Sequence, residues 1–408
     1  MNPVQKDGMG LKKLLLGWVI VALVVAAACQ EKLTAPADCP ALCPGGYVIR
    51  DTVLDPIQDG DSSYEGYVLP GQGTTIRVSN GLPASEDRGV IRFNTRPDSL
   101  LLRDTLRTYT VDSASIEFTI TRRDTTVGGL KMYLYRLPAT IDTAATFAQV
   151  AADLTPANLL DSVLVDDTAD TPRIRVVFKD STTYKVDIPA ADSGVLAIGL
   201  AMAAASPTGV RVGTILTGSA APVFTSFVTA DITDTTLQKR SILLNPRFSD
   251  FVSQNPPTLD PDLLTTGGAP SARSLIRFDW PDFIRDSGQL VRVTLELIPT
   301  APMDGLPNDP AFLEARIVLS DLGSKSSLSQ STFAEFEIPE ASSDTVNFEI
   351  VSLLSAWQTI PTIPHALSLS LTPEGSSFTR ATFGSTRTPG KKPRLKVTYA
   401  VPFRFARP

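Results

Sequence analysis

Few residues of this chain could act as an acid, a base or a nucleophile. It contains a single histidine, His365, so a Ser–His–Asp or Cys–His site would have to use that residue. His365 follows a proline and precedes an alternating run over 366–371, which indicates a turn. The sequence motifs of serine hydrolases, zinc proteases and P-loop proteins are absent. We therefore predict that the protein is not an enzyme. The alternative is a glycoside hydrolase or lyase, because glycoside hydrolysis needs only a suitable pair of carboxylates.

An acidic loop near the start of the chain could bind a hard cation. Asp55, Asp59 and Asp61 supply three carboxylates next to Gly60, and calcium takes about six to eight oxygen ligands. The spacing departs from that of an EF-hand, and the closing glutamate is missing. Two interpretations are open, a structural calcium site and a solvated acidic turn, and we favour the turn. No other cofactor is predicted.

Aromatic side chains are the usual platform for a sugar ring, because the C–H face of the ring stacks on a flat π surface. Tyr64 and Tyr67, in the loop 63–67, are the candidate ligand-binding residues. Trp280 shares the apolar face of its strand, and Trp357 lies on the apolar side of a short helix. Both tryptophans are therefore predicted in the core.

The first 28 residues have the pattern of a secretory signal. Three lysines precede an apolar run over 14–25, and the small residues 26–28 precede Cys29. This ending resembles a lipobox, so we predict a signal peptide over 1–28, lipid attachment at Cys29 and a lipidated tether over 29–46. The alternative is ordinary cleavage near residue 28.

A lipid anchor would place the protein on a membrane after export. More than one acyl chain gives stable anchoring, whereas a single chain does not. Gln30 stands where an inner-membrane retention signal would have aspartate. The predicted location is the outer membrane or the cell surface.

The other two cysteines, Cys39 and Cys43, form an even pair just after Cys29. In an exported protein such a pair is usually oxidised, so we predict a disulfide. Structural zinc would need four cysteine or histidine ligands, and the only histidine is far away in the sequence.

Net charge limits the range of partners. The 408 residues carry a net charge of −6, and removal of residues 1–28 takes away three lysines and one aspartate, which leaves −8. Nucleic-acid binding needs a clustered positive field, so no nucleic-acid partner is predicted. The expected partners are the membrane, through the lipid anchor, and a polysaccharide.

A repeated motif indicates two similar domains. Residues 88–94 (RGVIRFN) return 185 positions later as 273–279 (RSLIRFD), a period too long for a solenoid. The runs that follow each copy alternate between apolar and polar residues, which is typical of half-buried strands. One helix is expected over 143–154. Many short strands separated by turn residues predict an all-β fold of two tandem β-sandwich or jelly-roll domains, over 47–240 and 241–408.

The expected strands correspond between the two copies. In the first copy they span 75–79, 88–95, 111–121, 130–137, 173–179, 182–188, 195–202, 210–216 and 223–230. In the second copy the runs 271–280, 291–297, 315–319, 366–371 and 393–399 match five of these in the same order. This correspondence predicts one topology used twice.

The second copy resembles DNRLRE domains. The resemblance rests on residues 273–279, on VSLLSAW at 351–357 followed by ALSLSL at 366–371, and on the closing PRLKVTY at 393–399. It covers about residues 241–403 and implies a jelly roll of secreted and surface proteins, some of whose relatives are similar to carbohydrate-binding modules. The first copy matches only in part.

The preferred function is therefore the non-catalytic binding of an extracellular polymer, with polysaccharide as the expected ligand. A purely structural or protein-binding surface protein is the alternative. Arg277, on the polar face of its strand, is expected to pair with a carboxylate on a neighbouring strand.

Overall fold

The computed structural model describes residues 47–82, 86–178, 193–233, 236–307, 309–339 and 341–402. Arg50–Tyr399 form one compact unit, and the described residues outside it, at the two ends of the chain, belong to a second unit. The predicted signal peptide, tether, lipid attachment site and disulfide lie outside the described residues, as does the strand expected over 182–188. Within the described ranges, no helix is both long and apolar enough to cross a membrane.

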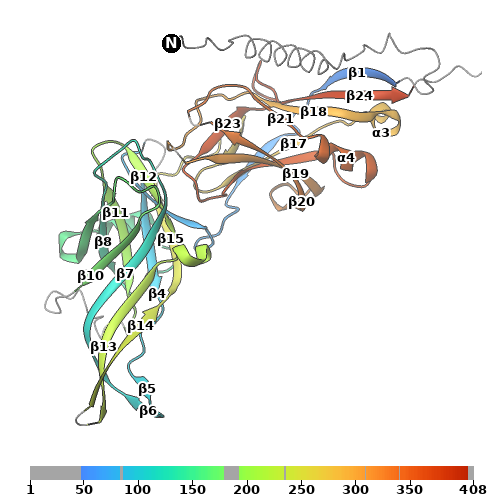
Figure 1. Cartoon of the computed structure of the whole chain (residues 1–408). Helices are drawn as coiled ribbons and strands as arrows, with labels where there is room; N and C mark the ends of the chain where they lie inside the picture. The colour runs from blue at the N-terminus through green and yellow to red at the C-terminus, as the bar shows by residue number, and fades with distance from the viewer. Residues whose placement is uncertain are drawn as a thin grey trace, which may run out of the picture. The chain divides into compact units, whose positions relative to one another are not determined.

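The fold is all-β, as predicted, and its sheets pack as two sandwiches (Figure 1). The strands of sandwich one are β3 (Thr75–Asn80), β4 (Glu86–Phe93), β5 (Leu100–Leu102), β6 (Thr105–Arg107), β7 (Tyr109–Arg123), β8 (Lys131–Leu137), β9 (Leu159–Leu164), β10 (Arg173–Phe178), β11 (Ala197–Ala203), β12 (Thr208–Gly213), β13 (Val223–Thr233), β14 (Thr236–Leu244) and β15 (Pro246–Gln254). Its helical elements are α2 (Phe147–Asp153), η2 (Pro156–Asn158) and η5 (Ile215–Ala220). One sheet has the order β14-β13-β7-β12-β3, with β10 also paired to β7, and the other has the order β15-β4-β11-β8-β9.

Sandwich two also takes strands from the beginning of the described chain. Its strands are β1 (Tyr47–Leu54), β2 (Ser62–Glu65), β16 (Leu263–Gly267), β17 (Ala272–Arg277), β18 (Gln289–Leu297), β19 (Ala311–Ser320), β20 (Ser327–Ile338), β21 (Val346–Glu349), β22 (Ala366–Thr372), β23 (Arg380–Gly384) and β24 (Arg394–Pro402). Its helical elements are α3 (Asp282–Ser287), η6 (Gly323–Lys325) and α4 (Val351–Thr359). The sheet orders are β1-β24-β18-β21 and β20-β19-β22-β17-β16-β23, with β2 also paired to β17.

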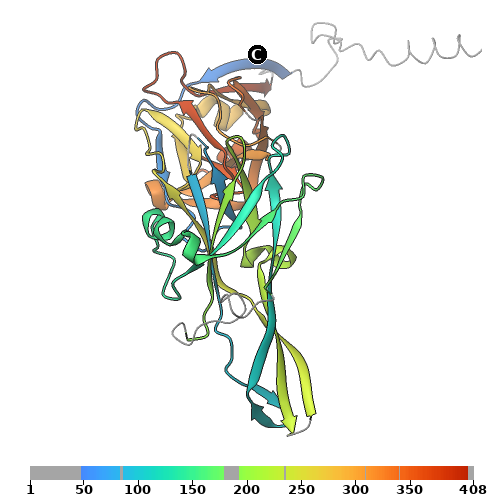
Figure 2. The ribbon, with the colours of Figure 1, turned by 90° about the vertical axis from the view of Figure 1, so that its left-hand side faces the viewer.

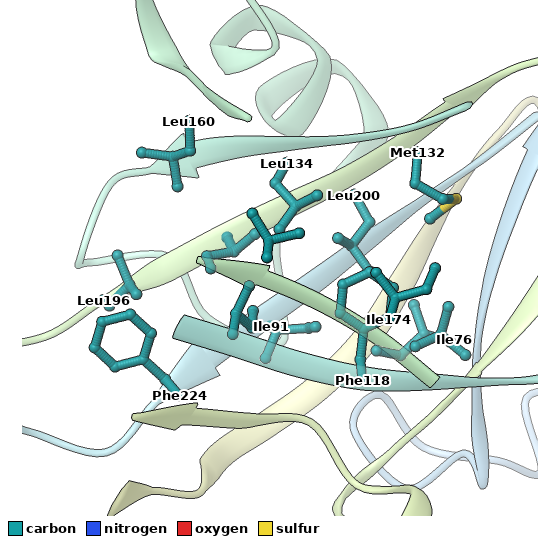
Figure 3. Packing of buried hydrophobic residues seen from close by; sticks show 14 of the residues in the cluster. Ile76, Ile91, Phe118, Met132, Leu134, Leu160, Ile174, Leu196, Leu200 and Phe224 are labelled. Atoms are coloured by element: carbon teal, nitrogen blue, oxygen red, sulfur yellow. The ribbon is translucent and has the colours of Figure 1, made fainter. Parts of the chain in front are cut away.

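The alternation of β7 produces the core of sandwich one. Ala114, Ile116, Phe118 and Ile120 are all buried, because successive side chains of a strand point to opposite faces of the sheet. They pack against apolar side chains of the facing sheet, and Figure 3 shows Phe118, Leu134 and Leu200 among the side chains gathered there. The predicted inward face of this strand is confirmed.

The long strands β7, β13 and β14 run together to one end of sandwich one, where the hairpin β5–β6 lies (Figures 1 and 2). Leu102 of the hairpin packs with Ala230 of β13. Leu101 and Leu106 are cross-strand partners in the same hairpin, and both are exposed. The hairpin therefore uses one face for packing and leaves two leucines in solvent.

The repeat seen in the sequence is a repeat of topology. In sandwich one β11 pairs with β4 and β8, and in sandwich two β22 pairs with β17 and β19. Likewise β13 lies beside β7, and β24 lies beside β18. The equivalences expected from the sequence are confirmed by strand pairing.

The strand pairing does not follow the predicted division at residue 240. Strands β14 and β15 pair with β13 and β4 of sandwich one. In sandwich two the corresponding places are taken by β1, beside β24, and by β2, on β17. Sandwich one is thus inserted into sandwich two between β2 and β16. A period of two identifies a strand but says nothing about a partner far away in the chain, so the sequence could not indicate this exchange.

Candidate binding groove

Two adjoining cavities lie along β15, an edge strand of sandwich one. Their volumes are about 230 and 310 Å³. Pro70, Asp250, Phe251 and Ser253 line both of them, so we treat them as one elongated depression and call it the β15 groove. Ligand sites are typically concave and largely apolar, with a few polar groups that fix orientation, and this groove has that composition.

Three phenylalanines give the groove an aromatic wall: Phe147, Phe248 and Phe251 line its larger cavity. Phe147 opens α2, and the helix start is fixed by a capping box in which Thr146 and Gln149 exchange hydrogen bonds. The Arg88 guanidinium lies 5.7 Å from the Phe147 ring, within the range of a cation–π contact. The capped turn and the arginine together hold this ring at the groove.

Asp250 is the carboxylate at the centre of the groove. Its Oδ2 accepts a hydrogen bond from the Gly71 backbone N–H at 2.7 Å, and its Oδ1 accepts one from the Phe251 N–H at 2.8 Å. Burial raises the pKa of Asp250, and the two N–H donors oppose the rise. Gly71 has φ +76°, which is the backbone region that glycine enters without a steric penalty.

A buried ion pair supports the groove from below. Arg77 donates through Nε to Asp87 at 2.8 Å, and both residues are buried. Ser253, which lines the groove, donates to the other oxygen of Asp87. The Arg77 guanidinium also lies 5.0 Å from the Phe251 ring. The position of the aromatic wall thus depends on charged groups inside the protein.

The predicted ligand residues Tyr64 and Tyr67 are half-buried rather than displayed as a platform. The Tyr64 side chain packs against Leu275, Val318 and Ala366. The Tyr67 ring lies 4.2 Å from the Arg273 guanidinium. Burial raises the pKa of the Tyr67 hydroxyl, and Arg273 opposes the rise. The two tyrosines therefore have structural partners, although Tyr67 directly precedes Val68, which lines the β15 groove.

The acidic loop is tied to basic side chains and to a hydroxyl group. Asp61 is buried, accepts hydrogen bonds from the Thr386 N–H and Oγ1, and lies 2.9 Å from Arg387. Asp59 is 3.7 Å from Arg387, and Asp55 is 3.8 Å from Arg394. Among the described residues no group of three or more His, Cys, Asp or Glu side chains is placed to hold a metal ion. The three carboxylates are arranged around arginines, and the calcium site stays an untested prediction.

His365 lies beside two tryptophans. Its ring centroid is 5.4 Å from that of Trp357 and 6.5 Å from that of Trp280. Burial lowers the pKa of His365. Trp280 and Trp357 are both buried and make an edge-to-face contact at 5.3 Å, so the prediction that they belong to the core is confirmed.

The arginines of the second motif copy form ion pairs. Arg277 makes a bidentate contact with Asp321, at 2.5 and 2.7 Å, and Arg273 makes one with Glu374, at 2.7 and 2.6 Å. The pairing predicted for Arg277 is confirmed, but its partner lies just after β19 rather than on a strand adjacent to β17.

Sequence reasoning did not identify the groove residues. Phe248, Asp250 and Val252 stand at every second position of β15 and so share one face of the strand. This spacing was the available signal. The other wall comes from the start of α2 and from the linker at Pro70, more than 100 residues earlier. Comparison of the chain with protein-family models and with curated proteins gave no match.

Proposed function

We propose that this protein is an exported, lipid-anchored surface protein that binds an extracellular polysaccharide in the β15 groove without cleaving it. The observation that carries the proposal is the aromatic wall of Phe147, Phe248 and Phe251 beside the carboxylate of Asp250. Aromatic faces stack on sugar rings, and a carboxylate accepts hydrogen bonds from hydroxyl groups. An elongated groove suits several consecutive units of a polymer.

The sequence features support the same proposal. The apolar N-terminal segment and Cys29 indicate export and lipid attachment. The second copy of the motif resembles DNRLRE domains, whose relatives include modules similar to carbohydrate-binding ones. The groove runs along β15 of sandwich one, and Ala269, Ser271 and Gly375 also line its smaller cavity. Part of the proposed binding surface therefore lies within residues 241–403, the stretch with the clearer resemblance.

The test is a binding screen of the full chain against a panel of polysaccharides, with and without calcium. We expect saturable binding to one class of glycan and an affinity about 5- to 150-fold weaker for Phe147→Ala, if a sugar ring gains on one aromatic ring the ~1–3 kcal/mol that a stacked base gains. Tyr67→Ala is the matched control, because it removes an aromatic ring outside the groove. If Tyr67→Ala lost glycan binding while Phe147→Ala kept it, the binding site would lie outside the groove and the proposed location would be wrong.

The same screen separates the other functional classes. Release of reducing ends from a bound glycan would contradict the non-catalytic part of the proposal. Failure to bind any glycan would favour a protein-binding role, for which the exposed Leu101 and Leu106 of the β5–β6 hairpin are the specific observation.

A further inference from the structure

The segment Asp55–Glu65 completes sandwich two although it precedes sandwich one in the chain. In the register of β2 on β17, Ser63 stands opposite Ser274, and their Oγ atoms are 3.0 Å apart. Ser63 Oγ also accepts a hydrogen bond from the Thr265 N–H at 2.8 Å. The segment therefore supplies partners to polar groups inside sandwich two.

A second set of contacts fixes the other end of the segment. Asp61 accepts hydrogen bonds from Thr386 N at 2.6 Å and Thr386 Oγ1 at 2.8 Å. The Ile57 N–H donates to the Arg277 carbonyl at 2.9 Å, and Arg277 donates to the Gly60 carbonyl at 2.8 Å. A buried donor that loses its acceptor destabilises the fold, and sandwich two without this segment would be left with such unpaired groups.

In sandwich one the two strand positions that correspond to β1 and β2 are filled by β14 and β15. Its β14 and β15 follow β13 directly in the chain, so that sandwich is completed by a neighbouring segment. The segment Asp55–Glu65 directly continues β1, and this stretch, Tyr47–Glu65, is joined to the strands from β16 onward only through residues 66–74 and the whole of sandwich one. That linker contains Gly66 and Gly71, both at positive φ. Noncovalent contacts, rather than closeness in sequence, hold the segment in sandwich two.

We propose that β1 and Asp55–Glu65 together, residues Tyr47–Glu65, form an exchangeable segment, and that this segment of one copy can complete sandwich two of a second copy. Every contact described above would form again, because the donor and the acceptor surfaces are those of the same sequence. Exchange of an identical element between copies is a low-cost route to association. Because donor and acceptor are different surfaces of the chain, reciprocal exchange gives a closed dimer, and one-way donation gives a chain of copies.

The test uses single cysteines at Ser63 and Ser274 in the full chain, with Cys29, Cys39 and Cys43 replaced by alanine. Two differently tagged variants, Ser63→Cys and Ser274→Cys, are mixed in denaturant, refolded together and oxidised. Facing residues of antiparallel strands have Cβ atoms about 4.5–5.5 Å apart, near the separation that a disulfide needs. The double variant Ser63→Cys/Ser274→Cys shows whether this pair can be bridged at all.

We expect a covalent dimer that carries both tags. While the dimer is the minor species, a tenfold higher concentration during refolding should raise the ratio of dimer to monomer by about tenfold. A mixture of Ser63→Cys with Ser331→Cys, whose new thiol lies at an exposed position of β20, is the matched control and should give no such product. Quantitative bridging within the double variant, with no mixed dimer at any concentration, would overturn the proposal. Failure of the double variant to form the bond would also overturn it, because β2 would then not lie on β17.

Discussion

At the scale of single residues, Asp250 links the groove to the stability of the fold. Its pKa in the folded protein is raised by burial above the ordinary value of 3.8. Between these two values the folded protein binds more protons than the unfolded chain, so stability rises as the pH is lowered through this interval. The contribution is complete below the ordinary value and is lost as the pH rises through the raised pKa.

Asp250→Asn should remove this contribution while its amide oxygen still accepts a hydrogen bond from Gly71. The stability of the variant relative to the natural protein is therefore expected to increase between about pH 4 and about pH 7. The measurement is the urea midpoint across this range. Asp142→Asn is the control, because Asp142 also lines the groove but is exposed. If the urea midpoints of Asp250→Asn and of the natural protein changed with pH in the same way, the raised pKa of Asp250 would be contradicted.

Residue types alone predicted some side-chain roles and not others. The period of each element placed Trp280 and Trp357 in the core, because burial of a face follows from local pattern. The exposure of Tyr64 and Tyr67 could not be inferred in the same way. It depends on Arg273 and Leu275, which come from a strand about 200 residues later.

At the scale of elements, α4 shows how a short helix is stabilised by tertiary packing. Trp357 is fully buried against Phe278 and Trp280. Trp357→Ala should lower the free energy of unfolding by about 3–5 kcal/mol, the usual cost of deleting a large buried aromatic side chain. Chemical unfolding followed by circular dichroism measures this without relying on tryptophan fluorescence. Ser352→Ala, at an exposed position of the same helix, should change stability by less than about 0.5 kcal/mol. Equal effects of the two substitutions would contradict the packing described.

The elements predicted best are those that alternate strictly. β7 and β18 were found because their apolar residues share one face over many positions. β2 was missed because it is four residues long and rich in serine and other polar residues. Its stability in the sheet comes from hydrogen bonds to β17 and to the Thr265 N–H, which no local pattern encodes.

At the scale of the whole described chain, ion pairs and hydrogen bonds join the two sandwiches. Arg211 of β12 and Asp309, which precedes β19, lie 2.5 Å apart and are both buried. Arg77 donates to the Ser377 carbonyl at 3.1 Å, and Thr75 donates to that of Ser376 at 2.7 Å. A Cβ added to Gly209 would come within 2.7 Å of the Phe378 ring, so the surfaces are in close contact there.

Asp309→Ala should leave the Arg211 cation buried without its partner. Removal of one member of a buried ion pair costs about 3–5 kcal/mol. We expect this loss of stability to weaken the contact between the two sandwiches. The single unfolding transition seen by calorimetry should then separate into two. Asp344→Ala removes an exposed carboxylate of sandwich two and should leave a single transition. A single unchanged transition in Asp309→Ala would show that the pair does not couple the sandwiches.

The insertion of sandwich one also determines how the protein would carry tension. Strands β1 and β24 are neighbours in one sheet, and Thr398 donates a hydrogen bond to Asp51 between them at 2.6 Å. A pull applied at Arg50 and Tyr399 would therefore act first on adjacent strands of sandwich two. Sandwich one, inserted between β2 and β16, would bear no load until those strands separate. Sandwich one, whose β15 forms one side of the candidate groove, is thus mechanically shielded.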